Sequence, residues 1–419
     1  MKALWTTLFA HFAVGKNAKL FREGVINWFS RTYPRQLTLV LKVSMPSKGV
    51  AFDVIQEFNY LLGYIGKNAP RFREICVMDD RVHPNAIHTP PATSPALWGE
   101  RIMQVVNRHS HKFINLINFN YCRNYYLHQN PLLADMDPPF QLPQAVRQLV
   151  LNPGPPDFPR AIAPIPTLQY VEYLDLQGYS LTPTQFLQQL RFCPRITTGL
   201  FTIFGHNDLV PVTTPVRLEQ IRHLRLFPMM HEERLEFLGT HIDGLSNTLT
   251  ELTIDGIVRP NPILHSTTLN PHRGGGLTDL TLMNLDMNVH DLFDFLTSCR
   301  ALKSLCINLP LIRETGMVGI LHRSTNEPQT LGVLPVLEKF SLFIHMDIHP
   351  YFPSFFEDMV KSRRNESLLR DSSSLIKAVT LIHLGVGDKP EVDELRESLA
   401  DLTGFELNID GPIDRFKRE

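Results

Sequence analysis

The apolar residues of this chain recur in one spacing along most of its length, apolar-x-x-apolar-x-apolar. Successive copies start 25 to 50 residues apart, and a degenerate copy at Ile196/Gly199/Phe201 divides the longest interval into two of 25 residues. The alternation at the end of each copy predicts a β-strand with one buried face. The nine copies are Val146/Leu149/Leu151, Val171/Leu174/Leu176, Ile221/Leu224/Leu226, Leu249/Leu252/Ile254, Leu277/Leu280/Leu282, Leu302/Leu305/Ile307, Leu337/Phe340/Leu342, Ile376/Val379/Leu381 and Leu402/Phe405/Leu407.

The segments between these copies change from period two to the 3.6-residue period of a helix. Residues Thr182 to Gln185 predict a helix start, with Thr182 as the cap, Pro183 in the first turn and Gln185 completing a capping box. A second helix is predicted to begin after Asn288. The apolar faces predicted for four helices are Phe186/Leu187/Leu190, Leu292/Phe293/Leu296, Leu235/Phe237/Leu238/Ile242 and Val392/Leu395/Leu399.

Strand-and-helix units of about 20–29 residues are the signature of leucine-rich repeats. A single unit exposes its apolar face to water, and stacking against neighbouring units buries that face. We therefore predict an α/β fold, namely a leucine-rich-repeat-like solenoid with a curved parallel sheet and helices on its convex side.

The repeat array is predicted to cover residues 146–411. Its predicted insertions, at 152–167, 258–276 and 361–374, are rich in proline, in proline and glycine, or in arginine and serine. The other segments are a lead-in at 1–35, divergent N-terminal repeats at 36–145 and a tail at 412–419. Within the divergent repeats we predict strands at 37–41, 73–77 and 113–119 and helices at 52–65 and 100–107.

Composition and charge narrow the classes of function. The 419 residues include 41 Lys+Arg and 42 Asp+Glu, and a net charge of −1 argues against a strongly basic nucleic-acid-binding protein. The five cysteines show no C-x-x-C spacing, which argues against a disulfide scaffold or structural zinc site and favours a reducing compartment, cytoplasmic or nuclear.

No stretch reaches the ~18–20 apolar residues of a membrane helix. His11 and two threonines interrupt the N-terminal apolar run, so we expect neither a membrane partner nor a signal peptide.

The best metal-like pattern is His345-x-Asp347-x-His349, because alternation on a strand would place all three side chains on one face. The alternative is a strand end whose polar residues face solvent. Cys306 alternates outward from two apolar neighbours, but nothing near it in sequence would lower its thiol pKa. We therefore expect no catalytic residues, no cofactor and no metal, and a protein that is not an enzyme.

Two further surface features have ordinary interpretations. The Pro-x-x-Pro tetrapeptides at 153–159 match polyproline ligands, and loop filling is the alternative that we favour. The basic cluster Lys361/Arg363/Arg364 is interpreted as a solvated helix end, because acidic residues flank it on both sides.

Residues that alternate with the buried leucines of such an array point away from its core, so they define a surface for a protein partner. The first predicted row is Asp175, Arg225, Thr253, Thr281, Cys306, Ser341 and Thr380. The second predicted row is Gln177, Phe227, Asp255, Met283, Asn308, Phe343 and Ile382. Arginine, phenylalanine and methionine are enriched in interface cores. The alternative is that irregular repeats turn these side chains into their neighbours or that loops cover them.

Segments near the N-terminus follow one another as a Leu-Trp pair, a mixed-charge stretch, a Trp-x-x-Arg helix and a Leu-x-Leu strand. They are Leu4–Leu8, Leu20–Glu23, Trp28–Thr32 and Leu37–Leu39, with Leu97-Trp98, His109–Phe113 and Phe192–Pro194 further along. This order resembles the region after the F-box in fungal (basidiomycete-type) F-box/leucine-rich-repeat proteins. The resemblance implies that the array recognises a substrate protein for ubiquitination, and that residues 1–35 are the remnant of a helical lead-in after the F-box.

The F-box itself, a helical segment before the Leu-Trp pair in that family, has only Met1–Ala3 in its place here. A Skp-type adaptor is therefore expected as a partner only if an upstream F-box exists. The leading hypothesis is non-catalytic recognition of an unidentified protein partner by the solenoid, as the substrate-binding part of an F-box-type ubiquitin ligase receptor. The alternative is an orphan scaffold or structural interaction protein with no ubiquitin link.

Overall fold

The chain divides into two compact units, Met1–Phe204 and Gly205–Glu419. The computed structural model describes residues 6–13, 17–45, 52–81, 98–123, 141–152, 165, 168–204, 216–217, 219–229, 242–243, 248–256, 276–308, 314–322, 333–344, 352–364, 375–383, 397, 399 and 406–410.

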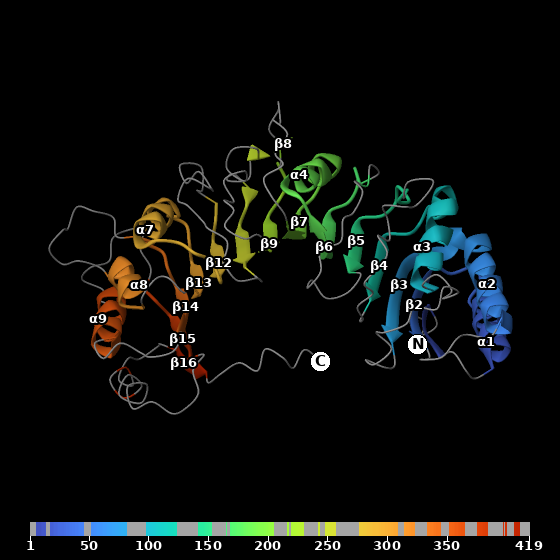
Figure 1. Ribbon diagram of the computed structural model, residues 1–419, viewed down its shortest axis with the longest axis horizontal. Coiled ribbons are helices and arrows are strands. Elements are labelled where there is room, and N and C mark those ends of the chain that lie inside the picture. The colour runs from blue at the N-terminus through green and yellow to red at the C-terminus, as the bar shows by residue number, and fades with distance from the viewer. Residues whose placement is uncertain are drawn as a thin grey trace. The chain divides into compact units, whose positions relative to one another are not determined.

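In the first unit every strand pairs in parallel with the next strand along the chain (Figure 1). Its strands are β1 (Thr7–Ala13), β2 (Leu37–Met45), β3 (Phe72–Arg81), β4 (Asn118–Arg123), β5 (Gln148–Asn152), β6 (Tyr173–Leu181) and β7 (Thr198–Ile203). Its helices are α1 (Ala18–Arg31), α2 (Phe52–Lys67), α3 (Trp98–Arg108) and α4 (Pro183–Phe192), with the short 3-10 turns η1 (Ala69–Arg71) and η3 (Ser110–Lys112).

The second unit repeats this arrangement. The strands of its parallel sheet are β9 (His223–Pro228), β11 (Glu251–Asp255), β12 (Asp279–Met283), β13 (Ser304–Asn308), β14 (Lys339–Ile344), β15 (Ala378–His383) and β16 (Glu406–Asp410). Its helices are α7 (Val289–Ser298), α8 (Glu314–Leu321) and α9 (Phe352–Arg364), and a separate two-stranded ribbon joins β8 (Val216–Arg217) to β10 (Ile242–Asp243).

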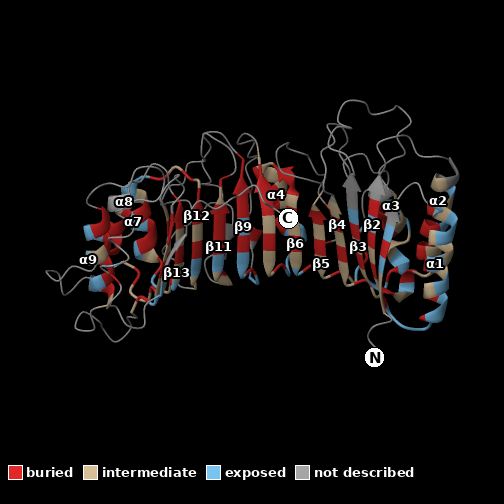
Figure 2. Cartoon of the chain, turned by 90° about the horizontal axis from the view of Figure 1, so that it is seen from below, coloured by how far each residue is buried: buried red, intermediate tan, exposed pale blue. Residues whose placement is uncertain are grey.

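The apolar spacing read from the sequence coincides with the strands and with their register. In the second unit the middle residue of each copy faces the middle residue of the next from β9 to β15, as Leu224, Leu252, Leu280, Leu305, Phe340 and Val379. The register predicted for the last copy is wrong by two residues, because Val379 faces Leu407, the third apolar residue of that copy; Leu402 and Phe405 lie outside the described residues. Figure 2 shows buried positions alternating with more exposed ones along the strands. The predicted α/β fold with stacked parallel strands is therefore confirmed, while the leucine-rich-repeat assignment and the curvature stay predictions.

The degenerate copy at Ile196/Gly199/Phe201 keeps its place in the sheet, because β7 pairs with β6. Gly199 stands where its neighbour β6 has Leu174. A Cβ atom on Gly199 would lie 2.5 Å from the Phe201 ring, so the phenylalanine fills the space that a leucine occupies elsewhere. Phe201 also packs edge-on against Phe186 of α4, with ring centroids 5.0 Å apart.

The helix signals are confirmed at α4 and partly at α7. Thr182 and Gln185 form the predicted capping box, and Asn288 caps α7 through Asp291. The predicted inward face of α7 is wrong at Phe293, which is 45% exposed, because the i, i+3, i+4 face of this helix is Leu292, Phe295 and Leu296.

Other helix predictions have mixed outcomes. Ile242, predicted to lie on a helix, is in the short strand β10 instead. Leu235, Phe237, Leu238, Val392 and Leu395 lie outside the described residues.

Residues 1–35 are helical only in part: α1 (Ala18–Arg31) contains the expected Trp28-x-x-Arg31 helix, but the described segment before it is not helical. Thr7–Ala13 is a strand that pairs in parallel with β2, and only then does α1 follow. Leu8 and Ala10 face Leu39 and Leu41 across the pair, so this segment has the alternation of the other strands. The strand predicted at 113–119 starts later, at Asn118, because η3 and the buried Phe113 and Leu116 occupy the turn before it.

The insertion predicted at 361–374 is wrong at its start, since residues 361–364 complete helix α9. Arg363, predicted to be solvated, is fully buried. Its Nε donates to the carbonyl oxygen of Leu321 at 2.6 Å, its Nη1 donates to that of Leu334 at 2.7 Å, and its Nη2 donates to that of Val333. One guanidinium therefore satisfies the end of α8 and the turn before β14.

Replacing Arg363 by alanine would leave three carbonyl groups without these donors. We expect Arg363→Ala to lower the free energy of unfolding by at least about 3 kcal/mol, because hydrogen bonds from a charged group are the strong ones. The matched variant Lys361→Ala removes only an exposed contact with Glu357, and its urea midpoint should stay unchanged. Equal urea midpoints for both variants would contradict the buried role of Arg363.

Gln189 of α4 is a buried polar side chain like Arg363, but its polar atoms are not hydrogen-bonded to described residues. It is 0% exposed, and among the described residues neither atom of its amide finds a hydrogen-bond partner. Because a buried amide without partners is unfavourable, Gln189→Met should raise the free energy of unfolding by about 1 kcal/mol. In the same helix Gln185→Ala removes half of the capping box and should lower it by about 0.5–1 kcal/mol. If both substitutions shifted the urea midpoint in the same direction relative to the wild-type chain, these roles of Gln189 and Gln185 would be refuted.

Candidate functional site

The side of each sheet opposite the buried leucine row is called here the open strand face. In the second unit the first predicted row lies on it in register, as Arg225, Thr253, Thr281, Cys306, Ser341 and Thr380. Arg225 is exposed, Thr253 is buried, and the other four are half-buried. The parallel pairing thus brings together residues that lie 25 to 39 positions apart in the sequence.

The second predicted row is mostly unavailable to a partner. Phe227, Met283 and Ile382 are less than 9% exposed, and Asn308 is 0% exposed. The other two residues of this row in the second unit, Asp255 and Phe343, are half-buried. The prediction that all of this row forms a surface is therefore wrong at four positions.

Hydrogen bonding explains the burial of Asn308. Its amide nitrogen donates to Asn284 Oδ1 at 3.2 Å, and the amide nitrogen of Asn284 donates to Asp255 Oδ1 at 2.9 Å. The backbone of Asn284, held at a left-handed φ of 53°, also donates to the carbonyl oxygen of Asn308 at 2.7 Å. These polar side chains therefore hold the carboxyl ends of three neighbouring strands together.

The remaining two predicted residues, Asp175 and Gln177, belong to the first unit. The carboxylate of Asp175 accepts a hydrogen bond from the backbone nitrogen of Gln177 at 3.0 Å. The carbonyl oxygen of Gln177 accepts one from the Thr202 hydroxyl at 2.7 Å. Both residues are half-buried, and these contacts support the strand irregularity that follows Leu176.

Arg225 is the most prominent group of the open strand face in the second unit. Its guanidinium carbon lies 4.9 Å from the centroid of the Phe227 ring. A cation placed over an aromatic ring keeps its charge while its side chain is held in one place. Arg225 therefore presents a fixed cation at the start of the row, where it neighbours Thr253 and precedes the smaller side chains of Thr281, Cys306 and Ser341 on the following strands.

The cysteine thiols are not activated. Burial and the neighbouring Asp255 raise the pKa of Cys306 to about 11, and burial raises the pKa of Cys122 to about 11, with Cys76 and Asp175 adding to it. Burial also raises the pKa of Cys193 and of Cys299. These cysteines are therefore neutral thiols at physiological pH, the weak form for nucleophilic attack and metal binding.

No group of three or more His, Cys, Asp or Glu side chains among the described residues is arranged to hold a metal ion. His345, Asp347 and His349 lie outside the described residues. Within the ranges that the structure covers, the helices are all too short or too polar to cross a membrane.

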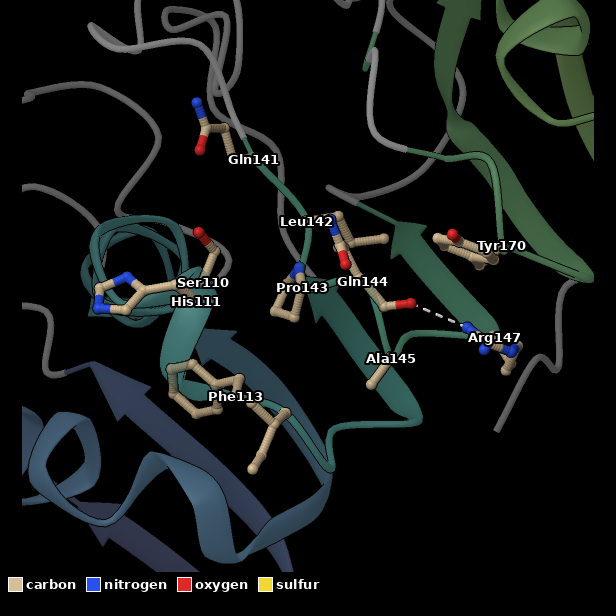
Figure 3. Close-up of a pocket in the computed structure, with 11 residues that line it drawn as sticks. Ser110, His111, Phe113, Gln141, Leu142, Pro143, Gln144, Ala145, Arg147 and Tyr170 are labelled. Carbon is tan, nitrogen blue, oxygen red and sulfur yellow. Dashed lines mark hydrogen bonds between the residues drawn. The ribbon is translucent and has the colours of Figure 1, made fainter.

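The structure adds a pocket in the first unit that the sequence did not reveal (Figure 3). It has a volume of about 780 Å³ and lies among the turns that precede β4, β5 and β6. Ile114, Leu142 and Pro143 give it apolar walls, while His111 and Arg147 give it basic ones. The lining residues come from three turns without a shared spacing, so no local pattern could have found them.

Arg147 is fixed at the mouth of this pocket. Its Nη1 donates to the carbonyl oxygen of Gln144 at 2.9 Å, and its guanidinium lies 5.1 Å from the centroid of the Tyr170 ring. Its Nε is 3.9 Å from the Glu172 carboxylate. The guanidinium of Arg195 also packs on the Tyr170 ring, at 5.3 Å.

Comparison of the chain with protein-family models finds no match, and a search of curated proteins finds none either.

The raised pKa of Cys306 predicts how it reacts. Below its pKa the thiolate fraction rises about tenfold per pH unit, so alkylation by iodoacetamide should climb without a plateau up to pH ~10. Asp255→Asn removes a negative neighbour, lowers the pKa and should speed the reaction at any fixed pH. Peptide mass spectrometry follows the site, and the urea-unfolded chain should plateau earlier. A plateau in the folded protein at or below pH ~9 would show that the thiol is activated.

Proposed function

We propose that this chain is a non-catalytic leucine-rich-repeat protein that binds a protein partner on the open strand face of Gly205–Glu419. The observation that carries the proposal is the in-register stacking of the apolar spacing over six described strands, β9 and β11 to β15. Strand-and-helix units in such stacks create extended binding surfaces, because every strand contributes one side chain to each row.

The chemistry of this face suits recognition better than catalysis. Thr281, Cys306 and Ser341 are small and half-buried, so a partner can approach the sheet closely. Arg225 supplies a fixed exposed cation, and arginine is enriched among residues that dominate binding energy. The neutral Cys306 thiol gives no nucleophile to this face.

We further propose that the partner is a substrate presented for ubiquitination, as the resemblance of the N-terminal segments to F-box/leucine-rich-repeat proteins suggests. The second candidate is a scaffold without a ubiquitin link. The placement of Thr7–Ala13 as a strand paired with β2 favours it, because this segment then continues the array instead of leading into it from an adaptor-binding module.

The test changes the charge on two sides of one unit. Arg225→Glu/Thr281→Glu changes the open strand face, and Asp294→Lys changes an exposed position of α7. Affinity capture with quantitative mass spectrometry measures how much of each specific partner is recovered. The recovered amount should fall by at least about tenfold with the first variant and stay unchanged with the second. Retention of all partners by the open-face variant would contradict the proposed surface.

The same capture separates the two roles. Co-purification of Skp and Cullin components with the wild-type chain supports the ubiquitin ligase receptor. Capture of partners without those components supports the scaffold and leaves the binding surface in place.

A further inference from the structure

The near-neutral charge of the whole chain conceals two oppositely charged units. Met1–Phe204 contains 20 Lys+Arg and 12 Asp+Glu, and Gly205–Glu419 contains 21 and 30. Their net charges are therefore +8 and −9. A net charge of this size creates a field that attracts groups of the opposite sign.

Much of the positive charge of the first unit lies along one edge of its sheet, where the turns lead into the strands. Backbone hydrogen bonds of 2.8 Å align these turns, from Ile117 to Arg73, from Arg147 to Ile117 and from Glu172 to Arg147. We call this edge of the sheet the basic turn edge. Its basic residues are Arg35, Arg71, Arg73, Lys112, Arg147 and Arg195. The described acidic residues at these turns are Glu74 and Glu172.

Part of this charge has a structural cause. Helices α1, α2, α3 and α4 each have a basic residue in the last turn, which complements the negative end of the helix dipole. Arg71 donates to the carbonyl oxygen of Phe29 at 3.0 Å and to the Thr32 hydroxyl at 3.1 Å, so it supports the fold. These roles do not explain Lys112, the last residue of the short 3-10 turn η3, or Arg195, which follows α4, and both side chains are exposed.

The pocket of Figure 3 lies among the same turns. Lys112 stands between the lining residues His111 and Phe113, and Arg195 packs on the lining residue Tyr170. Ile114, an apolar residue of the pocket wall, is 64% exposed. A cavity that has both apolar and basic walls and is bordered by exposed cations fits a ligand that combines negative charge with an apolar side chain.

The aromatic contacts favour a peptide over a single-stranded nucleic acid. Nucleic-acid surfaces of that kind use aromatic faces on which bases stack. Here the Tyr170 ring already packs against Arg147 and Arg195, and the Tyr33 ring packs against Arg71 at 5.3 Å. The tyrosines of this edge thus hold guanidiniums in place, an arrangement that serves carboxylate recognition.

We propose that the basic turn edge binds an acidic segment of a protein, with one apolar side chain of that segment in the pocket beside Ile114, Pro143 and Tyr170. This site does not use the open strand face, so it stands or falls independently of the function proposed above.

Fluorescence anisotropy with the full chain tests this proposal. The probe is a fluorescein-labelled oligoglutamate peptide with one central phenylalanine. Replacing that phenylalanine by alanine should weaken binding about tenfold, because the pocket loses its occupant. An oligolysine peptide with a central phenylalanine should not bind, and added salt should weaken the binding of the oligoglutamate peptide.

Two matched double variants locate the site. Lys112→Glu/Arg195→Glu should raise the Kd at least tenfold, and Lys19→Glu/Lys42→Glu makes the same charge change at other exposed positions of the same unit and should raise it less than about threefold. Circular dichroism verifies that both variants fold. Equal losses in the two variants, or no binding of the peptide by the wild-type chain, would overturn the proposal. Tighter binding of oligouridylate than of the peptide, lost in the first variant, would replace it with a nucleic-acid site.

Discussion

The structure depends on burying one apolar row per strand between the sheet and the helices that connect its strands. Fully burying a leucine or isoleucine side chain stabilises a protein by about 1.5–3 kcal/mol. In the second unit Leu224, Leu252, Leu280 and Leu305 are each 1% exposed and lie in direct register. A shift of one residue in any strand would turn its whole apolar set to the opposite face, so this row fixes the register of the array.

The turns reinforce that register at the edge where the strands begin. The Thr250 hydroxyl donates to the carbonyl oxygen of Arg222 at 3.0 Å, and the Thr278 hydroxyl donates to that of Thr250 at 3.1 Å. Thr197 makes the equivalent contact with Glu172 in the first unit. The buried row and the hydrogen-bonded turns hold the fold together. The surfaces proposed for recognition are the open strand face and the basic turn edge.

The sequence predicted the strands well because their signal is local. Leu280 and Leu282 alternate within one strand, and the capping box of Thr182 and Gln185 lies within four residues. The errors arose where the outcome depends on distant residues. Arg363 is buried because carbonyl groups about 30 to 42 positions away accept its hydrogen bonds, and Asn308 is buried through Asn284 of the neighbouring repeat.

The site was predictable only in part for the same reason. Alternation correctly placed Arg225 and Thr281 on the face opposite the leucines, but it carries no information on how strand ends pack. The charge of the two units is present in the sequence, yet a sum over the whole chain cancels it. The pocket beside Tyr170 forms from turns that only the stacked strands bring together.

The most direct test of the stacked register is a distance on the open strand face. Nitroxide labels at Thr281→Cys and Ser341→Cys, in a chain whose own cysteines are replaced, sit two strands apart on either side of position 306. Two strand spacings amount to about 10 Å, so the electron paramagnetic resonance spectrum of the doubly labelled protein should show strong dipolar broadening. A spectrum equal to the sum of the two singly labelled proteins would contradict the parallel, in-register array.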